Sequence, residues 1–185
     1  MAQPPFSVCV FCGSRMGEDP AFAETAEALG RALAEAGQRL VYGAGDVGLM
    51  GVVARAAMAA GGETMGVIPA HLMGREMANG ALTQLVVTEN MHERKKVMYM
   101  NSDAIVVMPG GAGSLDEFFE VLTWRQLALH GKPIFLLDVN GYWDPLSGLL
   151  THVVERGFAD ASLLSFVETV PDVPAVMAAL QGKSV

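Results

Sequence analysis

The strongest constraint on the fold is a repeated alternation between short apolar runs and longer segments with helical periodicity. The apolar runs indicate β-strands at residues 6–11, 39–42, 64–68, 85–88, 104–108 and 134–138, with a weaker run at 165–170. Helical segments between them cover residues 20–36, 48–60, 91–101, 115–129 and 144–156, and Asp172 with Pro174 starts a last short helix. Most runs are continuous in apolar residues, as expected when helices cover both faces of a sheet. The sequence therefore predicts an α/β fold, a Rossmann-like doubly wound parallel sheet in three α-β-α layers.

Composition and charge narrow the class of protein. The 185 residues are 51% hydrophobic, and no Pro/Ser-rich or charge-dense stretch divides them, so we expect a single domain spanning residues 1–185. The formal net charge of -8 argues against nucleic-acid binding and favours a small-molecule ligand. No apolar stretch reaches the roughly 18 residues of a membrane span, and the N-terminus lacks the pattern of a secretion signal. We therefore expect no membrane association and a cytoplasmic location.

The cysteines and histidines do not form a metal or redox site in the sequence. Cys9 and Cys12 read C-V-F-C, but residues three apart in a strand point to opposite faces, which favours two reduced core thiols over a redox pair. The histidines at positions 71, 130 and 152 do not have the spacing of metal ligands. We expect neither a metal nor a cofactor.

A glycine-rich turn follows the apolar run at residues 104–108. In M-P-G-G-A-G-S-L-D-E, the lack of side chains lets the backbone adopt positive φ and approach a ligand closely. The N–H groups of Ala112, Gly113 and Ser114 can then converge on phosphate oxygens at the positive end of the next helix. A plain tight turn is the alternative. The segment G-A-G-D-V-G at residues 43–48 matches a dinucleotide-binding pattern only weakly, because the expected acidic partner is misplaced.

Acidic residues follow this turn and have two interpretations. Glu117 stands three residues after Ser114, which fits a capping box in which the acid serves only the helix end. It can also serve as a catalytic carboxylate next to the bound anion. Glu120 shares the face of Glu117, whereas Asp116 is turned about 100° away and is expected to be solvated.

The segment M-H-E-R-K-K at residues 91–96 places three cationic side chains at a helix start, where the dipole disfavours them. Arg94 and Lys95 are therefore candidates for binding a phosphate or a leaving group, with a solvated helical face as the alternative. The remaining irregular segment, residues 71–82, reads as a long loop that serves as a lid or as a surface connection.

The chain resembles the Lonely Guy (LOG) family of cytokinin riboside 5′-monophosphate phosphoribohydrolases, formerly described as "possible lysine decarboxylases". Its paired signature is M-H-x-R-K followed by P-G-G-x-G-T-x-x-E, which here reads M-H-E-R-K at residues 91–95 and P-G-G-A-G-S-L-D-E at residues 109–117. Similarity extends over about residues 6–150. The departures from the family pattern are Ser114 for threonine, Asp116 for glutamate, and Ala44 for a glycine, whose added methyl group is expected beside the ligand.

The resemblance implies hydrolysis of the N-glycosidic bond of a purine nucleoside 5′-monophosphate, giving free base and ribose 5-phosphate. Glu117 would orient or deprotonate water and stabilise a cationic sugar, and Arg94 would assist the departing base or hold the nucleotide. The implied substrate-binding positions are Ser14, Gly45, Met91, Lys95, Gly110, Gly111, Ala112, Gly113, Ser114 and Glu120. The family usually forms dimers, which implies a homodimer. The preferred base stays open among adenine, N6-prenylated adenine and other purines.

Two other functions remain open at this point. A decarboxylase would need pyridoxal phosphate on a lysine, and the candidates are Lys95, Lys96, Lys132 and Lys183. A non-catalytic nucleotide or molybdenum-cofactor carrier would keep the glycine loop but would need neither Glu117 nor Arg94.

Overall fold

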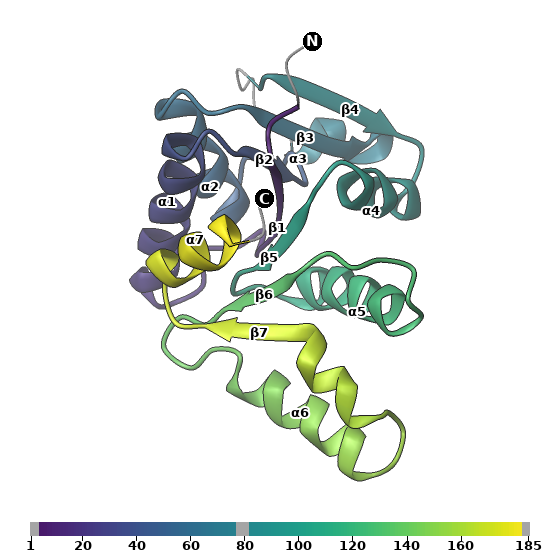
Figure 1. Cartoon of the computed structure of the whole chain (residues 1–185). Helices are drawn as coiled ribbons and strands as arrows, with labels where there is room; N and C mark the ends of the chain where they lie inside the picture. The colour runs from purple at the N-terminus through teal and green to yellow at the C-terminus, as the bar shows by residue number, and fades with distance from the viewer. Residues whose placement is uncertain (1–3, 77–81, 183–185) are drawn as a thin grey trace.

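A computed structural model describes residues 4–76 and 82–182 (Figure 1). Its strands form one parallel seven-stranded sheet in the order β4-β3-β2-β1-β5-β6-β7. The strands are β1 (Ser7–Phe11), β2 (Arg39–Tyr42), β3 (Thr64–Pro69), β4 (Gln84–Thr88), β5 (Ala104–Val107), β6 (Ile134–Leu137) and β7 (Val167–Val170). The helices are α1 (Pro20–Glu35), α2 (Gly48–Ala59), α3 (Met73–Glu76), α4 (Met91–Met100), α5 (Ala112–Gln126), α6 (Asp144–Glu155) and α7 (Val173–Gln181), with 3₁₀ turns η1 (Ala70–Leu72) and η2 (Ala161–Phe166). The predicted Rossmann-like fold is confirmed.

Helices cover both faces of the sheet, as Figure 1 shows. Helices α1, α2 and α7 pack on one face, and α4, α5 and α6 pack on the other. Cys9 and Cys12 belong to the two opposite core layers and are both free and buried, as expected. Strand β4 departs from the expected burial because it forms an edge of the sheet, where Leu85 and Val87 remain exposed.

The helix caps confirm most of the predicted helix starts. The carboxylate of Asp19 accepts from the N–H of Ala21, and the Asn90 side chain accepts from the N–H of Glu93, both at 2.9 Å. Asp172 caps α7 in the same way. Each bond satisfies an N–H group that the helix itself leaves without a partner.

The predicted capping box at Ser114 is wrong. Helix α5 begins at Ala112, with Gly111 at the N-cap position and no side-chain cap, so Ser114 lies inside the first turn. The glycines let the chain enter the helix three residues earlier than the cap pattern suggested. Glu117 is consequently not a capping residue, and the capping explanation for its presence no longer applies.

The segment expected to be a long loop is partly helical. Residues 70–76 form η1 and the short helix α3, because a 3₁₀ turn continues directly from the end of β3. The rest of the expected loop, residues 77–81, lies outside the described residues.

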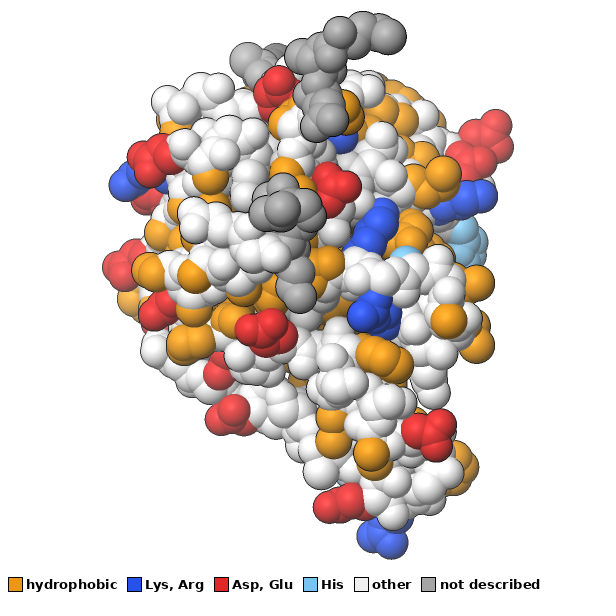
Figure 2. Space-filling model, in the orientation of Figure 1, with side chains coloured by type: hydrophobic (Ala, Val, Ile, Leu, Met, Phe, Trp, Pro, Cys, Tyr) orange, Lys and Arg blue, Asp and Glu red, His pale blue; other side chains and the backbone are white. Residues whose placement is uncertain are grey.

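Among the described residues, no helix combines the length and apolar character needed to cross a membrane. On the face shown in Figure 2, described Lys and Arg side chains are scattered among acidic ones and do not gather into a stripe.

Candidate active site

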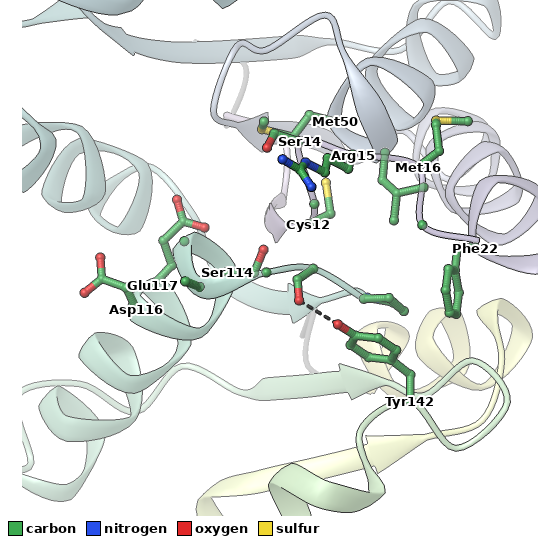
Figure 3. Close-up of a pocket in the computed structure, with 18 of the residues that line it drawn as sticks. Cys12, Ser14, Arg15, Met16, Phe22, Met50, Ser114, Asp116, Glu117 and Tyr142 are labelled. Atoms are coloured by element: carbon green, nitrogen blue, oxygen red, sulfur yellow. Dashed lines mark hydrogen bonds between the residues drawn. The ribbon is translucent and has the colours of Figure 1, made fainter. Parts of the chain in front are cut away.

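A cavity of about 570 Å³ opens at the carboxyl ends of β1 and β5. These strands pair with each other at the point where the sheet order reverses, with β2 to β4 on one side and β6 and β7 on the other. Ligands of open α/β sheets bind at this kind of switch point, because helix N-termini converge there. Figure 3 shows Glu117 and Asp116 on one side, Ser14 and Arg15 above, and Tyr142 and Phe22 at the far end.

The glycine turn contributes free backbone donors to this cavity. The N–H groups of Ala112, Gly113 and Ser114 occupy the first turn of α5, where no acceptor within the helix is available, and no side chain caps them. They lie at the positive end of the helix macrodipole, so the cavity offers a site for an anion. Gly111 and Gly113 have open space where a side chain would stand.

The glycines of this turn do not adopt the positive φ that the sequence suggested, and close packing requires a glycine only at position 110. None of Gly110, Gly111 and Gly113 is among the positive-φ glycines of the described chain. A Cβ at Gly110 would lie only 2.1 Å from the Ser114 hydroxyl oxygen. Gly110 is therefore needed because Ser114 folds back against it, which holds the turn tightly to the start of α5.

The loop after β1 is tied to the glycine turn through its backbone. The N–H of Gly13 donates to the Pro109 carbonyl at 3.0 Å, and the Gly13 carbonyl accepts from the N–H of Leu49 at 3.0 Å. Gly48 has a φ of +60°, and a Cβ there would overlap the backbone of Ser14. Three segments far apart in the sequence are thus fixed as one floor of the cavity.

Arg94 is buried and held by backbone carbonyl groups. Its Nε donates to Val67 O at 3.1 Å, and its Nη2 donates to Gly43 O at 2.7 Å. A Cβ at Gly43 would lie 1.9 Å from Nη2. The guanidinium carries five N–H donors, so this arrangement leaves donors for a ligand while fixing the orientation of the group.

Glu117 projects from α5 at the side of the cavity shown in Figure 3. Burial raises the pKa of Glu117 to about 7, against the opposing effect of the nearby Arg94 guanidinium. Its carboxyl group is half-buried and exchanges a proton near neutral pH. A carboxyl group with this property beside an anion site and a fixed guanidinium is suited to acid–base chemistry.

Lys95 lies in a different environment from Arg94. Its ammonium group is 2.9 Å from the Asp116 carboxylate and 2.8 Å from the Glu120 carboxylate. Burial alone lowers the pKa of Lys95, but the hydrogen bonds to Glu120 and Asp116 outweigh it and leave the pKa raised. Lys95 is therefore charged and paired by side chains of α5. Asp116, expected to be only solvated, is exposed but also forms this ion pair.

The structure brings together most of the predicted site residues. The cavity is lined by Arg94, Glu117, Ser14, Met91, Gly110, Gly111, Ala112, Gly113 and Ser114. Lys95, Glu120 and Gly45 do not line it. Ala44, expected beside the ligand, also lies outside the lining: its methyl group packs toward Gly66 of β3, and its φ is +57°.

Three residues of this region were missed by the sequence reasoning. Arg15 lines the cavity and is exposed, and Gly43 makes room for Arg94. Tyr142 donates from its hydroxyl to the Gly110 carbonyl at 2.7 Å, across 32 residues of sequence. Arg15 directly follows Ser14, which the sequence had singled out, whereas only the fold brings Tyr142 to the glycine turn.

Comparison with known proteins identifies relatives over most of the chain. The family model described as "Possible lysine decarboxylase" matches residues 50–180. A cytokinin riboside 5′-monophosphate phosphoribohydrolase of Rhodococcoides fascians is 43% identical over 96% of this chain and 90% of the relative. The Arabidopsis thaliana enzyme of the same name, LOG7, is 41% identical over 89% of this chain and 76% of the relative.

Solved structures with the same fold include proteins of a different described role. The molybdenum cofactor binding protein of Rippkaea orientalis has a TM-score of 0.75 at 20% identity, covering 98% of each chain. The molybdenum cofactor carrier protein of Chlamydomonas reinhardtii has a TM-score of 0.73 at 23% identity, covering 97% of this chain and 98% of its own. These two likenesses show the shared fold alone. The sequence matches are far closer, and the chain belongs to the family of the cytokinin riboside 5′-monophosphate phosphoribohydrolases.

Proposed function

We propose that the chain, acting as a single domain, hydrolyses the N-glycosidic bond of a purine nucleoside 5′-monophosphate of the cytokinin type. The observation that carries this proposal is the placement of Glu117 and Arg94 in one cavity with the uncapped start of α5. The relatives that share about two fifths of the sequence are named for this activity. The products are the free base and ribose 5-phosphate.

The 5′-phosphate binds at the start of α5, where the N–H groups of residues 112–114 and the Ser114 hydroxyl face it. This anchor positions the ribose near Glu117. In its ionised form Glu117 orients a water molecule and stabilises the oxocarbenium-like transition state. Water oxygen bonds to C1′ as the C1′–N bond breaks, and the bonding electron pair leaves with the base.

Arg94 stabilises the departing base by hydrogen bonding and not by giving up a proton, because a guanidinium does not deprotonate in proteins. Its fixed orientation supports this role, since two carbonyl groups hold Nε and Nη2. The proton that the base gains therefore comes from solvent or from the attacking water. Preorganised donors of this kind avoid reorganisation during the reaction.

A turnover assay tests the proposal. Purified protein is incubated with AMP and with N6-isopentenyl-AMP, and released base is quantified by chromatography. We expect Glu117→Ala and Arg94→Ala to lose most of the activity while retaining a cooperative unfolding transition. Arg55→Ala, which removes an exposed arginine paired with Asp46, is the control and should retain parental activity. Parental rates in both active-site variants would refute the assignment.

The same experiment separates the alternatives. A carrier would bind AMP without releasing base, and it would need neither Glu117 nor Arg94. A pyridoxal-dependent decarboxylase would need a lysine in the cavity, but Lys95, Lys96 and Lys132 all lie outside its lining. Lys183 lies outside the described residues. The rate ratio between N6-isopentenyl-AMP, AMP, GMP and CMP identifies the preferred base.

We further propose a homodimer in the cytoplasm. Support for the dimer comes from apolar side chains left exposed on and after α4 and α5, namely Met100, Phe119, Leu127 and Leu129. The buried residues of α5, including Phe118 and Leu122, are already used by the core. Sedimentation equilibrium measures the oligomeric state, and the two free cysteines are compatible with a reducing compartment.

A further inference from the structure

The peptide between Gly110 and Gly111 is held by Tyr142. This tyrosine lies in the connection between β6 and α6, and its hydroxyl donates to the Gly110 carbonyl at 2.7 Å. Figure 3 shows the bond on the side of the glycine turn away from Ser14 and Arg15. The Gly110 carbonyl oxygen therefore points away from the part of the cavity beneath those two residues.

The direction of this carbonyl fixes the direction of the next N–H group. The described chain has no cis peptide bond, and in a planar trans peptide the N–H points opposite to the preceding C=O. The N–H of Gly111 is thus turned toward the side of Ser14 and Arg15. Gly111 lines the cavity, and a side chain at its position would meet open space.

Two adjacent glycines make this orientation reversible in principle. Because glycine lacks a Cβ, a Gly–Gly peptide can rotate with little steric cost. Rotation would replace the Gly111 N–H by the partial negative charge of a carbonyl oxygen. An anion at the start of α5 would then meet an acceptor in place of a donor.

We propose that Tyr142 is a positioning residue that locks the Gly110–Gly111 peptide with its N–H toward the substrate phosphate, adding a donor to the three at the start of α5. This inference rests on the proposed function for the identity of the anion. Tyr142 is itself positioned by its ring, which packs edge-on against Phe22 at 5.4 Å and Trp143 at 4.8 Å. Its hydroxyl acts on the phosphate through the peptide.

The matched variants are Tyr142→Phe and Asn140→Gly. The first removes only the hydroxyl and keeps the ring contacts. The second removes the Asn140 hydrogen bond to Asp19 in the same connection, and glycine preserves the φ of +54° found at that position. It loosens the connection without touching Gly110.

The measurements are equilibrium binding of ribose 5-phosphate and adenosine, and the kinetics of AMP hydrolysis. Tyr142→Phe should weaken ribose 5-phosphate binding and raise KM for AMP about five- to tenfold, as loss of one neutral hydrogen bond implies, with kcat nearly unchanged. Adenosine binding should not change, because adenosine carries no phosphate. Asn140→Gly should match the parent in all measurements.

Three outcomes would overturn the inference: unchanged ribose 5-phosphate binding in Tyr142→Phe, equal weakening of adenosine binding, or the same loss in Asn140→Gly. Failure of the proposed function is a separate result. If the parent binds ribose 5-phosphate but releases no base, the binding comparison still decides the role of Tyr142. If the parent hydrolyses AMP and Tyr142→Phe keeps its KM, only the role of Tyr142 fails.

Discussion

The Nη2 atom of Arg94 lies 2.7 Å from the carbonyl oxygen of Gly43, at a position where a side chain on Gly43 would occupy the same space. Arg94 lies on α4 and Gly43 follows β2, and 51 residues of sequence separate the two partners. The orientation of the guanidinium in the cavity depends on this contact. Gly43 is consequently required for the site although it contributes no functional group.

Replacement of Gly43 by alanine should strongly reduce activity without unfolding the protein. The new Cβ would lie 1.9 Å from Nη2, so the guanidinium must leave its place. The φ of Gly43 is not positive, so alanine is compatible with the backbone. We expect kcat/KM for AMP to fall about 100-fold, a loss typical for displacement of a positioned catalytic group.

Gly45→Ala is the matched control for this change. The nearest atoms to a Cβ at Gly45 all belong to the Met50 side chain, with its terminal methyl group at 2.8 Å and its sulfur at 3.4 Å, and that flexible side chain can move. Activity of this variant should stay within a few-fold of the parent. Equal losses in both variants would show that the loop, and not the position of Arg94, is responsible.

The pH dependence of activity should report the titration of Glu117. Burial raises the pKa of this carboxyl group to about 7, and the proposed mechanism needs its ionised form. We therefore expect kcat/KM for AMP to rise with pH and to level off above about pH 7, with one proton involved. The substrate phosphate titrates near pH 6, so the informative range is about pH 6 to 8. A flat profile across that range would contradict the assignment of Glu117.

The same pKa shift predicts that Glu117 destabilises the folded protein at alkaline pH. A carboxyl group whose pKa is raised on folding costs no stability below the unfolded value of 4.5, and the cost grows as pH rises toward about 7. Glu117→Gln should therefore increase the free energy of unfolding at pH 8 by about 1–3 kcal/mol, a range that allows for partial solvation of the carboxylate. Urea unfolding at pH 8 and pH 4.5 measures the difference.

The gain in Glu117→Gln should shrink to a few tenths of a kcal/mol at pH 4.5, roughly RT ln 2, because Glu117 is then protonated in the folded parent and about half protonated in the unfolded parent. A gain that is equal at both pH values would mean that packing, and not ionisation, separates the variant from the parent. Activity of the variant should be lost at every pH.

Removal of the Lys95 ammonium should cost stability through its partner Glu120. Lys95 is buried, and Glu120 is only partly exposed, so Lys95→Met leaves a carboxylate without compensation. We expect a loss of about 1–3 kcal/mol in the free energy of unfolding. This is less than the cost of breaking a fully buried ion pair, because Glu120 is partly exposed. Asp116→Asn should cost less than about 1 kcal/mol, because Asp116 is largely exposed. Urea unfolding measures both free energies, and similar losses in Lys95→Met and Asp116→Asn would contradict this ranking.

The order of strands and helices was predictable from the sequence because it depends on local patterns. Strand β2 and the start of α4 were predicted to the residue, and the caps at Asp19 and Asn90 stand directly before the helix starts predicted at residues 20 and 91. The start of α5 was missed by three residues because a glycine N-cap leaves no side-chain signal.

The residues of the candidate site were also predictable only in part. The glycine turn, Arg94 and Glu117 could be named from motifs, because each stands at a strand end or a helix start. The charge pattern alone could not distinguish Arg94 from its neighbour Lys95, since both are cations in one motif, and their separate roles came from the family resemblance. Helical geometry turns them to different surroundings, which places Arg94 on backbone carbonyls at the cavity and Lys95 against two acids of α5.

By itself the sequence determined the layered parallel sheet, the glycine turn at the start of α5 and the family, since strand periodicity and motif spacing are local properties of the chain. Only the tertiary structure decided which atoms share the cavity: Gly43 beneath Arg94, Tyr142 behind Gly110, and Ala44 turned away toward β3. These contacts join residues tens of positions apart, and their geometry follows from the packing of different strand ends. No local pattern encodes that packing.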